Sequence, residues 1–186
     1  MGGFERVADE EQLRGFRFSV HRVRFRAPDG TEFDRDILRH TGAVGVVPLH
    51  DDGTVTLVRQ FRAALDGDLL ELPAGVRDVA GEPDEVTAQR ELGEEVGLQA
   101  GRLEHLVTFH NSPGFSDESV AVFLATELTE VEARPQGIEE ESMVIERIPL
   151  AAALAMVEDG RITDAKSIIG LTLTARRAGG DGGQPG

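Results

Sequence analysis

The chain has 186 residues and a formal net charge of −15 at pH 7, because 34 acidic residues outnumber 19 basic ones. This length fits one domain with a small appendage and is enough to bury a sizeable core. A negative field of this size disfavours general binding to nucleic acids, and the absence of cysteine excludes disulfides and thiolate metal sites. No run of 18 apolar residues predicts a membrane span and no apolar leader follows the N-terminus, so we expect a cytoplasmic protein.

The N-terminal part of the sequence predicts a hairpin. Residues 1–15 are polar and acidic without a strong period. Alternating apolar residues predict a strand over 16–25, and a shift of their phase between Val20 and Val23 indicates a bulge. A turn then leads into a return strand over 31–39.

The rest of the chain alternates strands with three helices. The central helix is the clearest, because Pro83 is tolerated at a first helical position and Gly97 suits a C-terminal cap. Strands around one central helix, with two helices at the end, predict an α/β/α sandwich with a mixed sheet. The tail, 179–186, has five glycines in eight residues and is expected to be disordered. Strands are expected at 42–49, 54–62, 68–75, 103–110, 118–128 and 142–148, and helices at 83–96, 150–159 and 164–177.

Two sets of side chains separate on the central helix. At about 100° per residue, an apolar stripe has three carboxylates on its flank. Such carboxylates repel one another at pH 7, and only Arg90 is a nearby counter-charge in the sequence. They indicate either a solvated acidic face or an oxygen-ligand site for a hard divalent cation. The stripe is Ala88, Leu92 and Val96, and the carboxylates are Glu91, Glu94 and Glu95.

The context of this helix favours the cation site. Glu71-Leu-Pro-Ala-Gly75 precedes the helix, and the whole run resembles the Nudix box. That box reads Gly, five residues, Glu, seven residues, Arg-Glu-apolar, one residue, Glu-Glu, one residue, Gly-apolar. Every fixed position from Glu82 to Leu98 matches, but six residues rather than five separate Gly75 from Glu82. The additional residue falls in the loop before the helix and leaves the spacing of the helix carboxylates unchanged.

The resemblance implies a Nudix-type α/β/α fold, preceded by the antiparallel strand segment, and hydrolysis of a diphosphate with Mg²⁺ or Mn²⁺. It implies that Glu91 and Glu95 bind the metal directly, with Glu94 as a further ligand or catalytic group. The Ala74 carbonyl and Glu141 are additional candidate ligands. Structural roles inside the box are implied for Gly75, Glu82, Arg90 and Gly97.

Other segments resemble the ADP-ribose pyrophosphatases within the Nudix family. The run Val58-Arg-Gln-Phe-Arg62 precedes the ELPAG sequence, and Pro113 follows Leu98 by 15 residues, close to a marker proline of that subfamily. An ordinary turn is the alternative for Pro113, and a surface arginine at a strand end is the alternative for Arg62. The resemblance covers about residues 40–170. The implied substrate-binding residues are Arg59, Arg62, Phe115, Asp117 and Glu118.

An acidic loop over 137–142 is the remaining candidate for chemistry. In the ADP-ribose pyrophosphatases a loop glutamate at about this place acts as catalytic base or metal ligand. A solvated loop is the alternative, and His50 and His110 are less favoured bases because they suit strand ends. In order of preference, the loop candidates are Glu139, Glu140 and Glu141.

We therefore predict a Mg²⁺-dependent hydrolase that cleaves ADP-ribose to AMP and ribose 5-phosphate. Another nucleoside diphosphate sugar, such as GDP-mannose, is the near alternative. A non-catalytic nucleotide-sensing domain is less favoured, because no box carboxylate is missing. Removal of oxidised nucleoside triphosphates usually goes with shorter chains.

The resemblance also implies a homodimer that shares its site through N-terminal strands. Residues 1–40 are expected to form the dimerising strand segment, 41–178 the hydrolase domain and 179–186 the glycine-rich tail. No nucleic-acid or membrane partner is expected. A stacked adenine would need one of the nine phenylalanines or an arginine plane, because tryptophan and tyrosine are absent. Eighteen of the basic residues are arginines, which suits phosphate contacts, although codon bias also explains the count.

Overall fold

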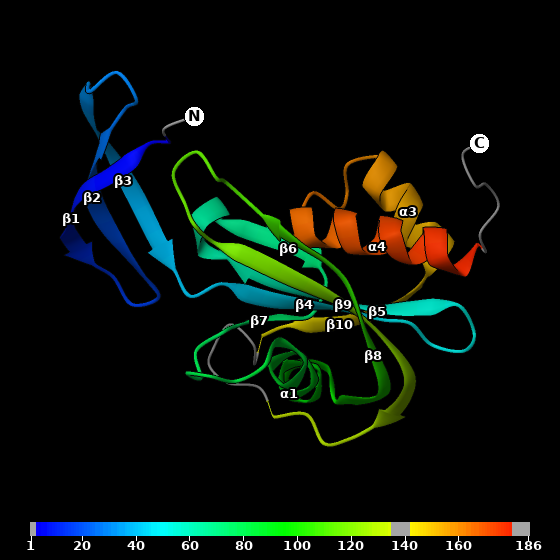
Figure 1. Cartoon of the computed structure of the whole chain (residues 1–186). Coiled ribbons are helices and arrows are strands. Elements are labelled where there is room, and N and C mark those ends of the chain that lie inside the picture. The colour runs from blue at the N-terminus through cyan, green and yellow to red at the C-terminus, as the bar shows by residue number, and fades with distance from the viewer. Residues whose placement is uncertain (1–2, 135–141, 180–186) are drawn as a thin grey trace. The chain divides into compact units, whose positions relative to one another are not determined.

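The computed structural model describes residues 3–134 and 142–179 and contains two compact units (Figure 1). Unit 1 combines residues 1–42 with 109–119, and unit 2 combines 43–108 with 120–186. None of the helices in the described part of the chain is long and apolar enough to cross a membrane.

Unit 1 is built on a three-stranded antiparallel sheet in the order β1-β2-β3. The pairing of β2 with β3 is continuous and sets arginines directly opposite carboxylates. Val23 is fully buried, whereas most of the other side chains in this sheet are partly or wholly exposed. The strands are β1 (Glu5–Arg14), β2 (Phe18–Arg26) and β3 (Glu32–His40), and the opposed pairs are Arg22 with Asp36, Arg24 with Asp34 and Arg26 with Glu32.

The antiparallel strand segment predicted for the N-terminus is confirmed, although two of its details differ. β1 lies in the segment that has no strong sequence period, and all of its residues are exposed. Its register against β2 shifts between Arg6 and Ala8 and again between Glu11 and Leu13, so the period of two on which strand prediction relies is broken. The bulge expected in β2 is absent from its pairing with β3; the irregularities lie against β1 instead.

Unit 2 contains the predicted mixed sheet structure with helices on its faces. One sheet has the order β10-β5-β6 and the other the order β7-β4-β9-β8, with β4 parallel to β9 and antiparallel to β7. Most predicted elements are confirmed within a few residues. The strands are β4 (Ala43–Pro48), β5 (Thr54–Arg62), β6 (Gly67–Glu71), β7 (Ala74–Val76), β8 (Leu98–His110), β9 (Ser119–Glu130) and β10 (Val144–Pro149); the helices are α1 (Asp84–Val96), α3 (Leu150–Glu158) and α4 (Ala165–Ala178), with a short 3-10 turn at Ala63–Leu65.

The strand expected over 68–75 is in fact two strands in two different sheets. β6 pairs with β5, and β7 pairs with β4. The chain changes sheets at Leu72 and Pro73, where the Val46 amide donates a hydrogen bond of 2.9 Å to the Pro73 carbonyl. Proline has no N–H to offer a strand ladder, which suits it to this crossing point.

Alternation along β4 and β9 buries both faces of the larger sheet. Val44, Val46, Ala121 and Phe123 belong to one apolar cluster with Ala88, Leu92 and Val96 of α1. The intervening side chains of Val47 and Val122 lie against α4. Figure 1 shows α1 on one side of the strands and α3 and α4 on the other, so the predicted α/β/α arrangement is confirmed.

We expect two glycine-to-alanine changes in helices to have opposite effects. A β-carbon at Gly170 in α4 would lie 2.8 Å from Leu72 Cδ1 and 2.9 Å from Val47 Cγ2, so Gly170→Ala should lower the free energy of unfolding by about 1–2 kcal/mol. At Gly93 in α1 the nearest atom would be 3.8 Å away, so Gly93→Ala should raise it by about 0.5–1 kcal/mol. Urea unfolding measures both, and equal effects would contradict the close packing of α4.

Candidate active site

The box glycine lies directly against a box carboxylate in unit 2. A β-carbon built on Gly75 would be only 1.8 Å from Cδ of Glu91, so any side chain at this position would collide with the carboxylate. One residue earlier, the Ala74 amide donates a 2.9 Å hydrogen bond to Glu95 Oε2. β7 and α1 therefore meet through the residues that the box predicts, and the additional residue in the loop does not disturb this alignment.

Two carboxylates of α1 and two of the loop before it surround a single guanidinium. Glu91 and Glu95 are 8% and 5% exposed, which is unusual for acidic residues. Arg90 Nη1 lies 2.7 Å from Glu91 Oε1 and 3.1 Å from Glu94 Oε2, and Nη2 lies 3.1 Å from Glu82 Oε2 and 3.4 Å from Asp78 Oδ1. Burial lowers the pKa of Arg90, but its hydrogen bond to Glu82 and the charge of Glu91 raise it overall. One cation thus contacts four carboxylates.

Among the described residues, no group of three acidic or histidine side chains is arranged to hold a metal ion. The contacts above give the reason, because Glu91 and Glu94 turn toward Arg90 and Glu95 accepts from the Ala74 amide. The donor chemistry nevertheless fits a hard divalent cation, which prefers carboxylate and carbonyl oxygens. Such a cation would also offset negative charge that Arg90 alone does not balance. The candidate ligand Glu141 lies outside the described residues.

Glu82 and Gly97 tie the ends of α1 to the neighbouring chain. Glu82 Oε2 accepts hydrogen bonds from Arg90 Nη2 at 3.1 Å and from Thr87 Oγ1 at 2.8 Å, and these two bonds lower the pKa of Glu82. Gly97 caps the helix at a φ of 64°, in the left-handed region that favours glycine. A β-carbon there would lie 2.9 Å from the Val131 carbonyl, so Gly97 also permits a close backbone approach.

The two arginines predicted to bind substrate lie on β5 and both pair with carboxylates. Arg62 Nε and Nη2 donate to the two carboxylate oxygens of Glu71 at 2.7 and 2.8 Å. Arg59 Nε donates to Glu146 Oε1 on β10 at 2.8 Å. No role was predicted for Glu71, which begins the ELPAG run and is only 1% exposed.

The predicted residues Phe115, Asp117 and Glu118 belong to unit 1, where they hold the 109–119 segment. The Leu38 amide donates to the Phe115 carbonyl at 2.7 Å, and the Phe115 ring is largely exposed. Glu118 Oε2 accepts from Asn111 Nδ2 at 2.9 Å, and the Glu118 carbonyl lies 3.1 Å from Nδ1 of His110.

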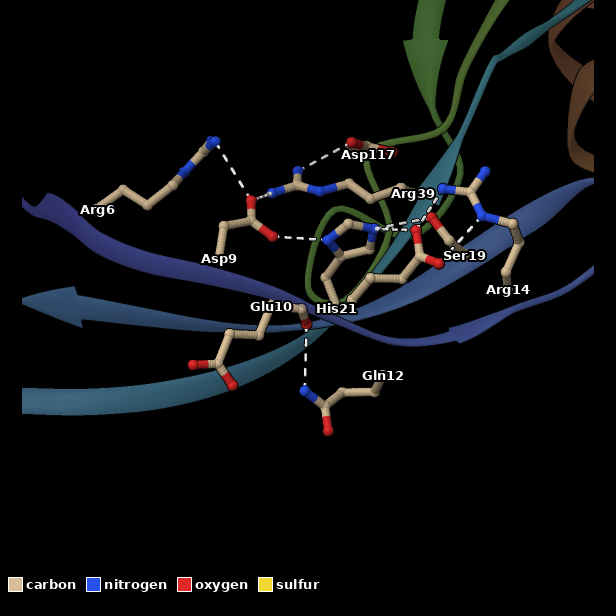
Figure 2. Close-up of polar contacts among 10 residues, drawn as sticks. Arg6, Asp9, Glu10, Gln12, Arg14, Ser19, His21, Arg39 and Asp117 are labelled. Atoms are coloured by element: carbon tan, nitrogen blue, oxygen red, sulfur yellow. Dashed lines mark hydrogen bonds and ion pairs between the residues drawn. The ribbon is translucent and has the colours of Figure 1, made fainter.

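Asp117 is part of an extended polar chain across the sheet of unit 1 (Figure 2). Arg39 donates to Asp117 Oδ2 at 3.0 Å and to Asp9 Oδ2 at 2.9 Å. Asp9 Oδ1 lies 2.6 Å from His21 Nδ1, and His21 Nε2 lies 2.9 Å from Ser19 Oγ. These contacts connect β1, β2, β3 and the loop. His50, the other histidine considered as a base, lies in unit 2 with its Nε2 2.8 Å from Thr56 Oγ1.

Comparison with known families decides the classification. The family model described as NUDIX domain matches residues 39–169. The chain belongs to the Nudix family. Hydrolases of this family generally use divalent metal ions, in agreement with the donor set on α1.

The chain is similar to curated proteins over most of its length. It is 44% identical to an ADP-ribose pyrophosphatase of Mycobacterium tuberculosis, covering 90% of this chain and 81% of the relative. An ADP-ribose pyrophosphatase of Bacillus subtilis is 38% identical, with 87% and 86% covered. A GDP-mannose pyrophosphatase of Citrobacter koseri is 31% identical, with 76% and 81% covered.

A solved structure supports the same classification. The chain superposes on a crystal structure described as an ADP compounds hydrolase with a TM-score of 0.85 and 26% sequence identity, covering 98% of this chain and 97% of the other. The predicted Nudix fold and the prediction of a Nudix hydrolase are therefore confirmed.

We expect Glu82 to make the stability of the protein depend on pH. Its pKa is lowered from the ordinary value of 4.5, chiefly by the hydrogen bond from Arg90, so its contribution is present above pH 4.5 and is lost as the pH falls through the lowered pKa. Glu82→Gln should flatten the dependence of the free energy of unfolding on pH as the pH falls below the ordinary value of 4.5. Urea titrations over this range provide the measurement.

The matched control is Glu85→Gln, an exposed carboxylate in the first turn of the same helix. The stability of this variant should change with pH in parallel with the wild type. If the two variants behave alike, Glu82 has no special role in holding the loop to the helix.

Proposed function

We propose that the protein hydrolyses the diphosphate of ADP-ribose to AMP and ribose 5-phosphate with bound Mg²⁺, Mn²⁺ being the alternative ion. The observation that carries this proposal is the contact of Gly75 with the carboxylate of Glu91, since it joins the two halves of the Nudix box in one site. The substrate is supported by two relatives named ADP-ribose pyrophosphatase and by the structural neighbour described as an ADP compounds hydrolase.

The proposed ligands of the cation are Glu91, Glu94 and Glu95 with the Ala74 carbonyl. When bound, a divalent cation neutralises phosphate charge and lowers the pKa of water. Glu91 and Glu95 are buried, so their carboxylates are already shielded from bulk water. A cation bound there would attract them more strongly than it would attract carboxylates in water. Arg90 would keep its pairing with Glu82, which supports its structural role.

The remaining roles belong to a phosphate-binding arginine and a loop base. Arg62 is proposed to bind a phosphate oxygen, because its Nη1 has no hydrogen-bond acceptor in the described part of the chain. Glu139 is proposed to accept the proton of the attacking water, with Glu140 second; both lie outside the described residues. Arg59, Phe115, Asp117 and Glu118 remain predicted substrate contacts. We also propose a cytoplasmic homodimer.

We expect activity to depend on the cation and on Glu95. EDTA should abolish turnover of ADP-ribose, and Glu95→Gln should lower kcat/KM by about 10²-fold or more, because the loss of one ligand removes stabilisation of developing charge. Steady-state assays of released AMP provide the measurement. Glu85→Gln, on the exposed side of the same helix, serves as control and should keep near-normal kcat/KM. Near-normal activity of Glu95→Gln would place the cation elsewhere.

We expect ADP-ribose to be the preferred substrate. Its kcat/KM should exceed that of GDP-mannose by at least about tenfold, which corresponds to about 1.4 kcal/mol of differential transition-state binding. A panel of nucleoside diphosphate compounds with Mg²⁺, read as phosphate released by a coupled phosphatase, decides the order. A preference for GDP-mannose, on which the Citrobacter koseri relative is named to act, would reject the substrate and leave the Nudix classification standing.

A further inference from the structure

The only lysine of the chain is buried beside β4, the strand that pairs with β7 at the start of the box. Lys166 lies in the first turn of α4, and its side chain is 11% exposed. Its stem passes over Gly45, where an added β-carbon would be 3.5 Å from Lys166 Cδ. Gly45 is the strand partner of Ala74, so the lysine crosses β4 next to a proposed cation ligand.

Lys166 shares one carboxylate with Arg62. Its Nζ contacts Glu71 Oε2, the same oxygen that accepts from Arg62 Nη2, while Arg62 Nε donates to Oε1. Lys166 Nζ also lies 3.1 Å from Asp164 Oδ2. Two cations and two carboxylates therefore form one cluster without net charge, around a Glu71 side chain that is almost fully buried.

The cluster is held in place by the start of α4. Asp164 Oδ2 accepts hydrogen bonds from the Ser167 amide at 2.9 Å and from Ser167 Oγ at 2.6 Å, as an N-terminal helix cap. Ser167 Oγ in turn accepts from the Leu72 amide at 2.8 Å. The lysine and its two acidic partners are thus fixed to the point where the chain changes sheets.

The second cation matters because Arg62 lies in a strongly negative environment. Burial lowers the pKa of Arg62, but its hydrogen bond to Glu71 and the charges of Glu71, Glu95 and Asp164 raise it overall. Without Lys166, Arg62 would be the only cation against Glu71 and Asp164. An uncompensated buried carboxylate destabilises the folded state. Glu71 would therefore hold the guanidinium of Arg62 more strongly.

We propose that Lys166 is a positioning residue that neutralises Glu71 and thereby leaves the charge and the outer N–H groups of Arg62 available to a phosphate oxygen. This proposal rests on the proposed function, which assigns phosphate binding to Arg62. It adds roles for Glu71 and Lys166. It differs from a purely structural ion pair, because it links Lys166 to phosphate affinity through Arg62.

The test measures binding of inorganic pyrophosphate by calorimetry in the presence of Mg²⁺. Lys166→Met keeps an apolar stem over Gly45 and removes the charge. We expect its Kd for pyrophosphate to rise about tenfold, which corresponds to about 1.4 kcal/mol. The KM for ADP-ribose should rise by a similar factor, with kcat changed less than about threefold. A structural defect alone would lower kcat through loss of folded protein and leave Kd unchanged.

A second variant restores the charge balance and covers the case in which Lys166→Met fails to fold. In the double variant Lys166→Met with Glu71→Gln, the buried negative charge is removed together with its cation. Pyrophosphate affinity should return to within about threefold of the wild type. In an Arg62→Gln background, Lys166→Met should cause no additional loss, because the lysine acts through the arginine.

Arg147→Met is the matched control, since it removes one positive charge from β10, where the exposed Arg147 pairs with Asp52 in the turn before β5. It should leave pyrophosphate affinity unchanged. Wild-type affinity in Lys166→Met, failure of the double variant to recover, additive losses with Arg62→Gln, or absence of pyrophosphate binding by the wild type would each overturn the proposal. Failure of the wild type to hydrolyse ADP-ribose would reject the substrate alone, because the pyrophosphate titrations do not depend on turnover.

Discussion

The change of sheets at Leu72 and Pro73 is the constraint on which the rest of the site depends. It leaves Glu71 paired into the sheet of β5 and, after the two intervening residues, delivers Ala74 and Gly75 to β4. Both residues of the crossing are fastened by hydrogen bonds: the Leu72 amide donates to Ser167 Oγ of α4, and the Pro73 carbonyl accepts from the Val46 amide of β4. Arg62, the proposed phosphate-binding arginine, and the acidic helix are therefore positioned by one short, proline-containing segment.

Charge is distributed unevenly around this segment. Arg90 contacts four carboxylates, whereas Arg62 and Lys166 together contact two. The balanced cluster lies on the α4 side, and the excess of negative charge lies on α1. A fold that holds crowded carboxylates gives up stability in the absence of a cation, because like charges repel most strongly where water is excluded. Cation binding would recover that free energy, which links occupancy of the site to folding.

The box helix could be predicted well from local features of the sequence, whereas features that depend on tertiary contacts could not. α1 begins and ends beside Pro83 and Gly97, and both residues act through backbone geometry that can be read locally. The bounds of β1 could not be predicted, because an exposed strand with two register shifts has no apolar alternation. The split between β6 and β7 depends on which strands lie nearby, so a continuous apolar run does not reveal it.

The candidate site likewise contains some residues that a local sequence pattern predicts and others that only tertiary contacts reveal. The spacing of Glu91, Glu94 and Glu95 was enough to place three carboxylates on one flank of a helix. The pair of Glu71 and Lys166 joins residues 95 positions apart, and no local pattern indicates such a contact. The single lysine was visible in the composition, but only its burial and its partners give it a role.

The position of β1 has a consequence for how copies of the protein meet in solution. It is an edge strand of its sheet, and an open edge invites pairing with the edge of another molecule. Four carboxylates and two guanidinium groups along its ten residues oppose such pairing while they are ionised. Pairing of two copies through this edge therefore requires that these charges be matched by opposite charges of the other copy.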